Sequence, residues 1–237
     1  MNGITIGDSA TARPRLSVAK LVSAARDLLV AGGAGAVVIR EVARSLGVAP
    51  SALYKHVTNR DQLLTLLVAD LYNELSQTCE VARDACPATA HRARLLAASS
   101  ALRVWARSHP AEFDFLFGYP IPGYAAPSPG PSQQAGQRFG RLFVEIFTAA
   151  WAEGRLRSRQ DHTLPGDIAR QLRDHQPAAG QPMRPGEMYP LVMGFQRMLG
   201  LVIVEISGQL GWALDDPAEL TEEQLRHLVD ELLLPDL

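Results

Sequence analysis

Apolar residues recur at intervals of three and four along almost the whole chain, the spacing that lines one face of an α-helix. Between residues 21 and 29, for example, the apolar side chains stand three, one, three and one positions apart. The alternation that marks a half-buried strand is nearly absent. Hydrophobic residues make up 47% of the 237, so the chain can bury a sizeable core. We therefore expect an all-α fold.

Glycines and prolines divide this pattern into separate helices. The glycines within 32–35 end the first helix, and Gly47 ends a short second one. Pro50 suits the first position of a brief third helix over residues 51–57. A capping pair of Asn59 and Gln62 opens a long helix, and further helices are expected over about 88–108, 137–153 and 190–210, with a last helix capped by Thr221 and Gln224. The stretch 109–132, with five prolines between 120 and 131, is expected to be largely loop, and 177–185 is a second break.

Charge is distributed unevenly along the chain. Residues 1–65 carry eight basic and four acidic residues, whereas the rest of the chain carries 15 basic and 21 acidic residues. A basic N-terminal segment in an otherwise acidic chain favours a polyanionic partner for that segment. An ordinary solvated surface can carry the same small net positive charge.

The brief third helix, PSALYKHV, has one apolar side and one polar side. Leu53 and Val57 are four residues apart and face the core, while Tyr54 lies between the two sides, where its hydroxyl can reach a phosphate. Two short helices joined by a glycine turn have the geometry of a DNA-reading unit. Small residues permit close approach to a major groove, and a lysine can donate to guanine. The outer residues are Ser51, Ala52, Lys55 and His56.

The start of the fourth helix adds an expected phosphate clamp. Its free N–H groups favour an anion, and Asn59 and Arg60 stand at that point. On an isolated helix, Lys55 and His56 would be ordinary solvated surface. Within this motif we expect them to contact DNA.

The stretch IREVARSLGVAPSALYKHVTNRDQLL resembles the DNA-binding domain of TetR-family repressors, over roughly residues 16–70. Val38 and Ala49 depart from the family pattern, which often has a capping threonine and a capping serine at these positions. The segment WARSHPAEFDFLFGYPIPGY is similar to the subgroup whose C-terminal part is called the WHG domain, which implies a ligand pocket and dimerisation. The resemblance implies DNA contacts for seven residues, and Asn59 of the expected phosphate clamp is added to them. The expected DNA-binding residues are therefore Arg40, Ser51, Ala52, Tyr54, Lys55, His56, Asn59 and Arg60.

The resemblance also implies a domain division. We expect a disordered N-terminal arm over 1–15, a three-helix helix-turn-helix DNA-binding domain over 16–62, and a larger helical ligand-binding and dimerisation domain over 63–237. The alternative for the arm is that Arg13 and Arg15 reach a minor groove.

Aromatic residues of the second part indicate a cavity for a largely apolar or aromatic effector, beside the proline-rich 120–131 segment as a mobile lid. Plain core packing is the default for any one of these aromatic residues. Tyr124 is a further candidate for a polar contact with the ligand. The expected ligand-binding residues are Trp105, His109, Phe113, Phe117, Tyr119, Phe147, Trp151, Met193 and Gln196.

In the family, the last two helices of two subunits form the dimer interface, and the resemblance implies the same here. The chain then acts as a dimer on double-stranded, palindromic operator DNA, and effector binding lowers operator affinity by a population shift. The expected interface residues are Leu199, Val202, Ile203, Ile206, Leu225, Leu228 and Leu232.

The rival hypothesis is an all-α enzyme that uses Arg103, His109 and Asp114 in the aromatic cavity. No nucleotide fingerprint or nucleophile elbow accompanies them. The histidines lack metal-ligand spacing, and Cys79 and Cys86 fit a reducing cytosol. We therefore expect a non-enzymatic regulator without metal or cofactor, located in the cytoplasm and not in a membrane.

Overall fold

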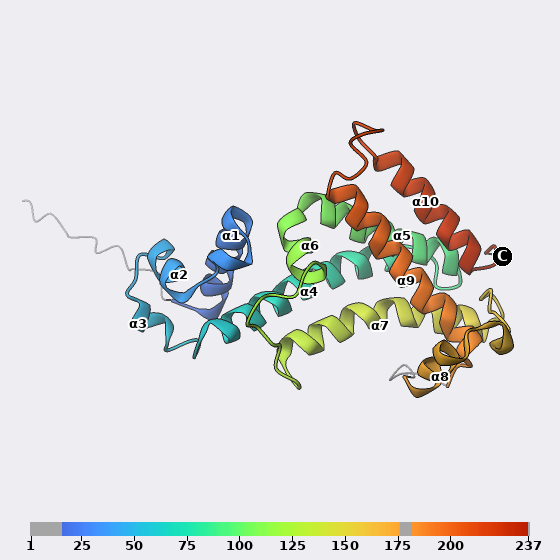
Figure 1. Ribbon diagram of the computed structural model, residues 1–237, viewed down its shortest axis with the longest axis horizontal. Helices are drawn as coiled ribbons and strands as arrows, with labels where there is room; N and C mark the ends of the chain where they lie inside the picture. The colour runs from blue at the N-terminus through green and yellow to red at the C-terminus, as the bar shows by residue number, and fades with distance from the viewer. Residues whose placement is uncertain (1–15, 176–181, 237) are drawn as a thin grey trace, which may run out of the picture. The chain divides into compact units, whose positions relative to one another are not determined.

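The computed structural model describes residues 16–175 and 182–236, and in these residues the chain forms ten α-helices and two 3-10 turns (Figure 1). Their only β feature is an isolated bridge between Leu156 and Leu233. This confirms the all-α prediction. The predicted N-terminal arm lies outside the described residues, as does most of the predicted break over 177–185. The chain divides into two compact units, residues 1–63 and 64–237.

The first unit contains α1 (Val18–Gly32), α2 (Ile39–Ser45), α3 (Pro50–Leu53) and the start of α4 (Arg60–Asp84). The Ser17 side chain caps α1 by accepting a hydrogen bond from the Lys20 N–H. Gly47, at a φ of 65°, makes the left-handed turn between α2 and α3, a conformation that glycine adopts without steric cost. The core is formed by the residues of the helical spacing, Leu21, Ala25, Leu29, Val42, Ala43, Leu53 and Val57.

The predicted capping pair opens α4. The Asn59 Oδ1 accepts a hydrogen bond from the Gln62 N–H at 2.9 Å, and the Gln62 Oε1 accepts one from the Thr58 N–H at 2.6 Å. Two of the N–H groups left free at the start of this helix region thus gain partners.

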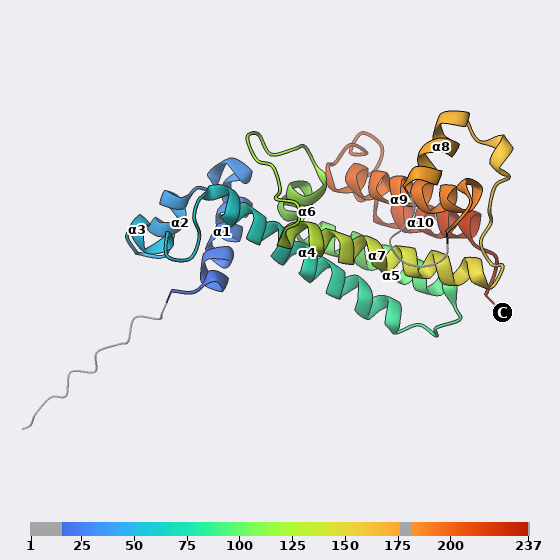
Figure 2. The same cartoon turned by 90° about the horizontal axis from the view of Figure 1, so that it is seen from below.

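The second unit contains the rest of α4, followed by α5 (His91–Ser108), α6 (Pro110–Phe117), α7 (Pro131–Ala152), α8 (Gly166–Asp174), α9 (Pro185–Ile206) and α10 (Ala218–Leu232). Helix α10 packs against both α9 and α5, and α5 also packs against α7. Figure 2 shows α9 and α10 on one side of α5 and α7, with α4 on the other.

Three expectations for this unit need correction. The predicted break after His109 contains α6, because Pro110 supplies the fixed φ that suits a first helical position. Helix α8 was not predicted at all. Thr221 does not cap the last helix: it is buried one turn inside α10, and its hydroxyl donates to the carbonyl of Pro217.

Helix α9 begins at Pro185, five residues before the predicted start at Pro190. A proline inside a helix has no N–H for the carbonyl four residues earlier, here that of Gly186. The Arg159 N–H donates to this carbonyl at 2.9 Å, so the lost hydrogen bond is replaced from outside the helix. A Cβ at position 186 would clash with the Arg159 carbonyl, which explains the glycine.

By length and composition alone, α9 is also apolar enough to cross a membrane, a property that core helices of globular proteins share. Two of its charged residues are ion-paired within the unit, Arg197 with Glu231 and Glu205 with Arg103. These pairs hold both charged residues within the unit, and α10 packs against α9.

Candidate functional site

Helix α3 and the turn after it present the expected polar side to solvent. Leu53 and Val57 are buried, which fixes the orientation of the segment. Tyr54 is 56% exposed, and the expected contact residues beside it are exposed or half-exposed. These residues are Ser51, Ala52, Lys55 and His56.

Arg40 is exposed on the neighbouring α2, whereas Arg44 in the same helix is ion-paired with Glu41. Neither α2 nor α3 has a side-chain cap, because Val38 and Ala49 occupy the capping positions. This confirms the two departures from the family pattern that the sequence indicates.

Arg60 has a structural role that the sequence did not reveal. Its Nε donates to the carbonyl of Val37 at 2.8 Å, and its Nη2 donates to the carbonyl of Ala34 at 2.9 Å. The guanidinium thereby ties the α1–α2 connection to the start of α4. The Asn59 side chain is also engaged, as the cap of α4. Both residues lie where predicted, but most of their hydrogen-bonding capacity is used within the unit.

The second unit has a half-open cleft of about 520 Å³ between α6 and the C-terminal end of α9. A volume of 300–1,000 Å³ is typical of small-molecule sites. Three predicted ligand residues, Phe113, Phe117 and Tyr119, line this cleft. The other lining residues are Pro110, Asp114, Gly118, Ile203, Ile206, Ser207 and Gln209. Of these, the sequence placed Asp114 in the cavity only under the enzyme hypothesis and assigned Ile203 and Ile206 to the dimer interface, because it did not indicate α6.

The remaining predicted ligand residues do not line this cleft. Phe147 is buried at a void of only about 20 Å³ between α5, α7, α9 and α10, a volume that suits close packing. Gln196 is exposed on α9, while Trp151 and Met193 are half-buried. The structure therefore does not bring the nine residues into one cavity.

Trp105 and His109 belong to a cluster that joins α4 to the α5–α6 junction. The Trp105 Nε1 donates to the Glu74 Oε1 at 2.8 Å, and the His109 ring stacks on the Trp105 ring at 4.9 Å. The predicted lid has one contact with α4, a hydrogen bond of 3.0 Å between the hydroxyls of Tyr124 and Thr65. The hydrogen bonds of Trp105 and Tyr124 thus both have their partner on α4.

The predicted dimer residues fall into two groups. Val202, Leu225, Leu228 and Leu232 are buried in the packing of α9 and α10 within the same unit, so they are not available to a second copy. We therefore correct this part of the predicted interface. Leu199, Ile203 and Ile206 are exposed or half-exposed on the other side of α9.

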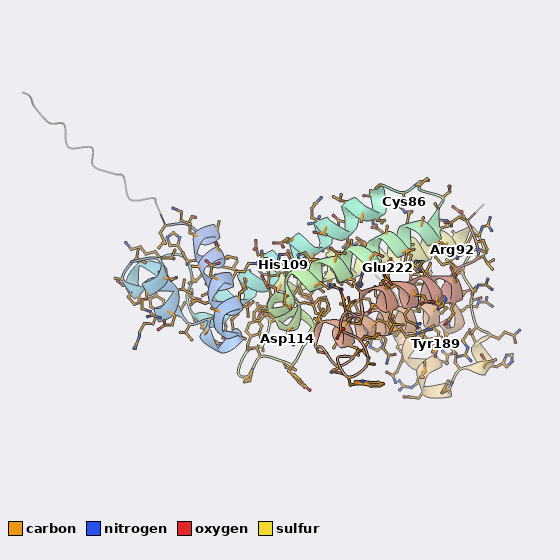
Figure 3. The ribbon with its side chains drawn as sticks, turned by 90° about the horizontal axis from the view of Figure 1, so that it is seen from above. Cys86, Arg92, His109, Asp114, Tyr189 and Glu222 are labelled. Atoms are coloured by element: carbon orange, nitrogen blue, oxygen red, sulfur yellow. The ribbon has the colours of Figure 1, made fainter. Side chains whose placement is uncertain are left out.

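The three residues of the rival enzyme hypothesis lie in different surroundings. Arg103 is buried in an ion pair with Glu205, His109 stacks on Trp105, and Asp114 lines the cleft. Figure 3 shows His109 near the junction of α5 and α6, and Asp114 on α6. Nothing in these contacts assembles a reacting centre from the three. No group of acidic, histidine or cysteine side chains that could hold a metal ion occurs in the described residues.

A DNA-reading motif on one unit and an all-helical second unit define the class of the protein as a DNA-binding transcriptional regulator. Residues 21–67 match the family model for bacterial regulatory proteins of the TetR family, and residues 95–228 match the model for the tetracyclin repressor-like C-terminal domain. The chain belongs to the TetR family of transcriptional regulators.

Curated relatives agree with this assignment, and solved structures share the fold. HTH-type transcriptional regulators of Mycobacterium tuberculosis and Mycobacterium bovis are each 33% identical over 227 residues, 94% of this chain and 95% of the relative. The structure is similar to that of the regulatory protein SCO4313, with a TM-score of 0.70, 24% identity and coverage of 90% and 95%. It is also similar to a TetR-family regulatory protein from Rhodococcus RHA1, with a TM-score of 0.63, 16% identity and coverage of 92% and 98%.

Proposed function

We propose that the chain is a cytoplasmic, ligand-responsive repressor that binds a palindromic operator as a homodimer and is released by a small, largely apolar or aromatic effector. The observation that carries this proposal is the orientation of the recognition segment. Burial of Leu53 and Val57 leaves Tyr54 and Lys55 exposed in the turn that follows the four-residue helix α3, a segment small enough for a groove to accept. Arg40 extends the same expected contact set onto α2.

The revised DNA contact set assigns Arg60 and Asn59 indirect roles. By holding the α1–α2 connection and the start of α4, they position the helices that carry the contacts. One amino group of the Arg60 guanidinium, Nη1, remains available for a phosphate.

The proposed dimer is built on the outer side of α9. Val192, Gln196 and Leu199 are spaced four and three residues apart and are exposed or half-exposed. Only 28% of the apolar stretch of α9 is buried within the chain. Large exposed apolar faces mark interaction sites. The exposed side of α10, in contrast, is charged and suits the rim of such an interface.

The proposed response begins at the cleft. A ligand there contacts α6, which is joined to α5 through His109 and is followed by the loop that Tyr124 ties to α4. Helix α4 continues into the DNA-binding unit. A ligand that binds better to one conformer of α6 and α4 shifts the population toward that conformer, which lowers operator affinity.

A gel-shift experiment with DNA from the two flanks of the protein's own gene tests the proposal. We expect a shift with one flanking fragment that survives an excess of random DNA. Planar apolar compounds that raise the melting temperature should also release this fragment, because both effects follow from preferential binding to one conformer. A chain that shifts no flanking fragment beyond the random control would contradict the proposal.

A further inference from the structure

The cleft between α6 and α9 has one charged side chain in an otherwise uncharged lining. Asp114 of α6 is exposed and lines the cleft, and none of the other lining residues is basic or acidic. Among the described residues, its carboxylate is neither ion-paired nor hydrogen-bonded by a side chain. In contrast, nearby Arg107 is already engaged by Glu205 and Asp216.

The walls around Asp114 are apolar and aromatic. Phe113 forms part of the floor, and Ile203 and Ile206 contribute from α9. Phe117 is held in place by neighbouring rings, at centroid distances of 4.8 Å from Phe113 and 5.7 Å from both Tyr72 and Phe139. A wall held in this way is largely pre-formed, which lowers the entropic cost of binding a ligand.

The position of the Asp114 carboxylate depends on its neighbour at the end of α6. The Gly118 N–H donates to the Asp114 backbone carbonyl at 2.7 Å, which closes the last turn of the helix. A Cβ at position 118 would clash with the Asp114 Oδ1. The glycine therefore leaves room for the carboxylate at the rim of the cleft.

We infer that the effector is a cationic amphiphile, an aromatic or aliphatic body with an ammonium-type group that pairs with Asp114. This inference rests on the proposed effector role of the cleft and specifies the chemistry of the ligand. A neutral apolar ligand that filled the cleft would remove water from the unpaired Asp114 carboxylate, and this desolvation costs free energy. A cation compensates that cost by a charge-assisted hydrogen bond.

The aromatic residues of the cleft favour the same ligand. An ammonium group within about 6 Å of a ring face is attracted by the π electrons. Phe117 and Tyr119 both line the cleft, and the Tyr119 side chain is almost fully exposed, so it can adapt to a bound cation. An anionic ligand of the same shape meets the Asp114 carboxylate and no basic lining residue, so it is repelled.

The test uses three probes of one shape: 4-phenylbutylammonium, 4-phenylbutan-1-ol and 4-phenylbutyrate. Isothermal titration calorimetry on the full chain at low salt should rank them cation, alcohol, anion in order of falling affinity. Asp114→Asn should weaken the cation by about tenfold and leave the alcohol unchanged, since hydrogen bonds to charged groups contribute about that much. Raising the salt concentration should weaken only the cation in the wild type.

Asp27→Asn is the matched control, because Asp27 is an exposed carboxylate of the DNA-binding unit and does not line the cleft. It should not change the binding of any probe. Circular dichroism and the melting temperature of both variants verify that they are folded. Equal affinities of the cation and the alcohol for the wild type, equal effects of the two substitutions, or no measurable binding of the cation would each overturn the inference.

A parallel gel shift without probe separates this inference from the proposed function. If the wild type binds the fragment but shows no cation preference, only the inference fails. If it binds no DNA yet prefers the cation through Asp114, the cleft chemistry stands and the repressor proposal fails.

Discussion

Arg103 of α5 and Glu205 of α9 form a bidentate ion pair, with Nε to Oε2 at 2.7 Å and Nη2 to Oε1 at 2.8 Å. Both side chains are less than a tenth exposed. Arg107 donates to the same carboxylate and also to Asp216, and its hydrogen bonds hold the pKa of the Asp216 carboxyl below its usual range. The pair thus fixes the end of α9, and the network extends to the loop before α10.

Removing one partner of this pair should destabilise the second unit strongly. In Glu205→Gln the buried guanidinium of Arg103 keeps only the more distant Glu222, at 3.4 Å, as a counter-charge, and we expect a loss of about 3 kcal/mol in the free energy of unfolding. Urea denaturation measures this change in the free energy of unfolding. Glu223→Gln, at an exposed position on α10, is the control and should change stability by less than about 0.5 kcal/mol. Equal values for both variants would show that the buried pair contributes nothing.

The two cysteines should differ in reactivity. Cys79 is buried in α4, and burial, with a smaller contribution from the charge of Glu80, raises the pKa of its thiol to about 12. Cys86 is half-buried after the end of α4. Because the thiolate is the reactive form, a disulfide reagent at pH 8 should titrate one thiol in the native protein and two in urea. Rapid labelling of Cys79 without denaturant would contradict this burial.

Ala49→Ser should stabilise the DNA-binding unit. Ala49 occupies the capping position of α3 in an extended conformation, with φ −70° and ψ 144°, and it offers no side-chain acceptor. A serine there can accept a hydrogen bond from an N–H of the first turn, a gain of about 1 kcal/mol. Slower amide exchange in α3 and a higher melting temperature check the gain. Ala49→Val adds size without an acceptor and should show neither effect.

Val192→Glu and Leu199→Glu should convert the proposed dimer into monomers. Each places a charge on the outer apolar side of α9, where a second copy would bury it unpaired. Val30→Glu, at an exposed position of α1, is the control variant and should remain dimeric. Sedimentation velocity distinguishes the states. A monomeric wild type at micromolar concentration would end the dimer proposal.

Local signals made the DNA-binding unit predictable from sequence. The three- and four-residue spacing, the glycine turn and the Asn59–Gln62 pair depend on neighbours in the chain, and each has its expected structure. The partners of Arg60 lie 23 and 26 residues away, so no local pattern could identify them.

The second unit was less predictable because its contacts are distant. The pattern of α9 shows two apolar sides, but not which side α10 covers, and for this reason Val202 and Leu228 were assigned to the wrong surface. Because of the prolines after position 119, the whole stretch is expected to be a loop, so the sequence indicates neither the short α6 nor the cleft beside it. Asp114 was placed in a cavity from the sequence, but together with Arg103 and His109, which the structure keeps in other surroundings.

Fluorescence anisotropy with the flanking DNA fragment tests the central claim most directly, through two variants of the recognition segment. Lys55→Ala should lose about 1–3 kcal/mol of binding on the specific fragment and much less on random DNA, because a base contact is lost. Tyr54→Phe removes an exposed hydroxyl and should weaken both DNAs similarly if that hydroxyl binds a phosphate, since phosphates carry no sequence information. A wild type that binds both DNAs equally, or a Lys55→Ala variant with equal losses on both, would contradict sequence-specific recognition by this segment.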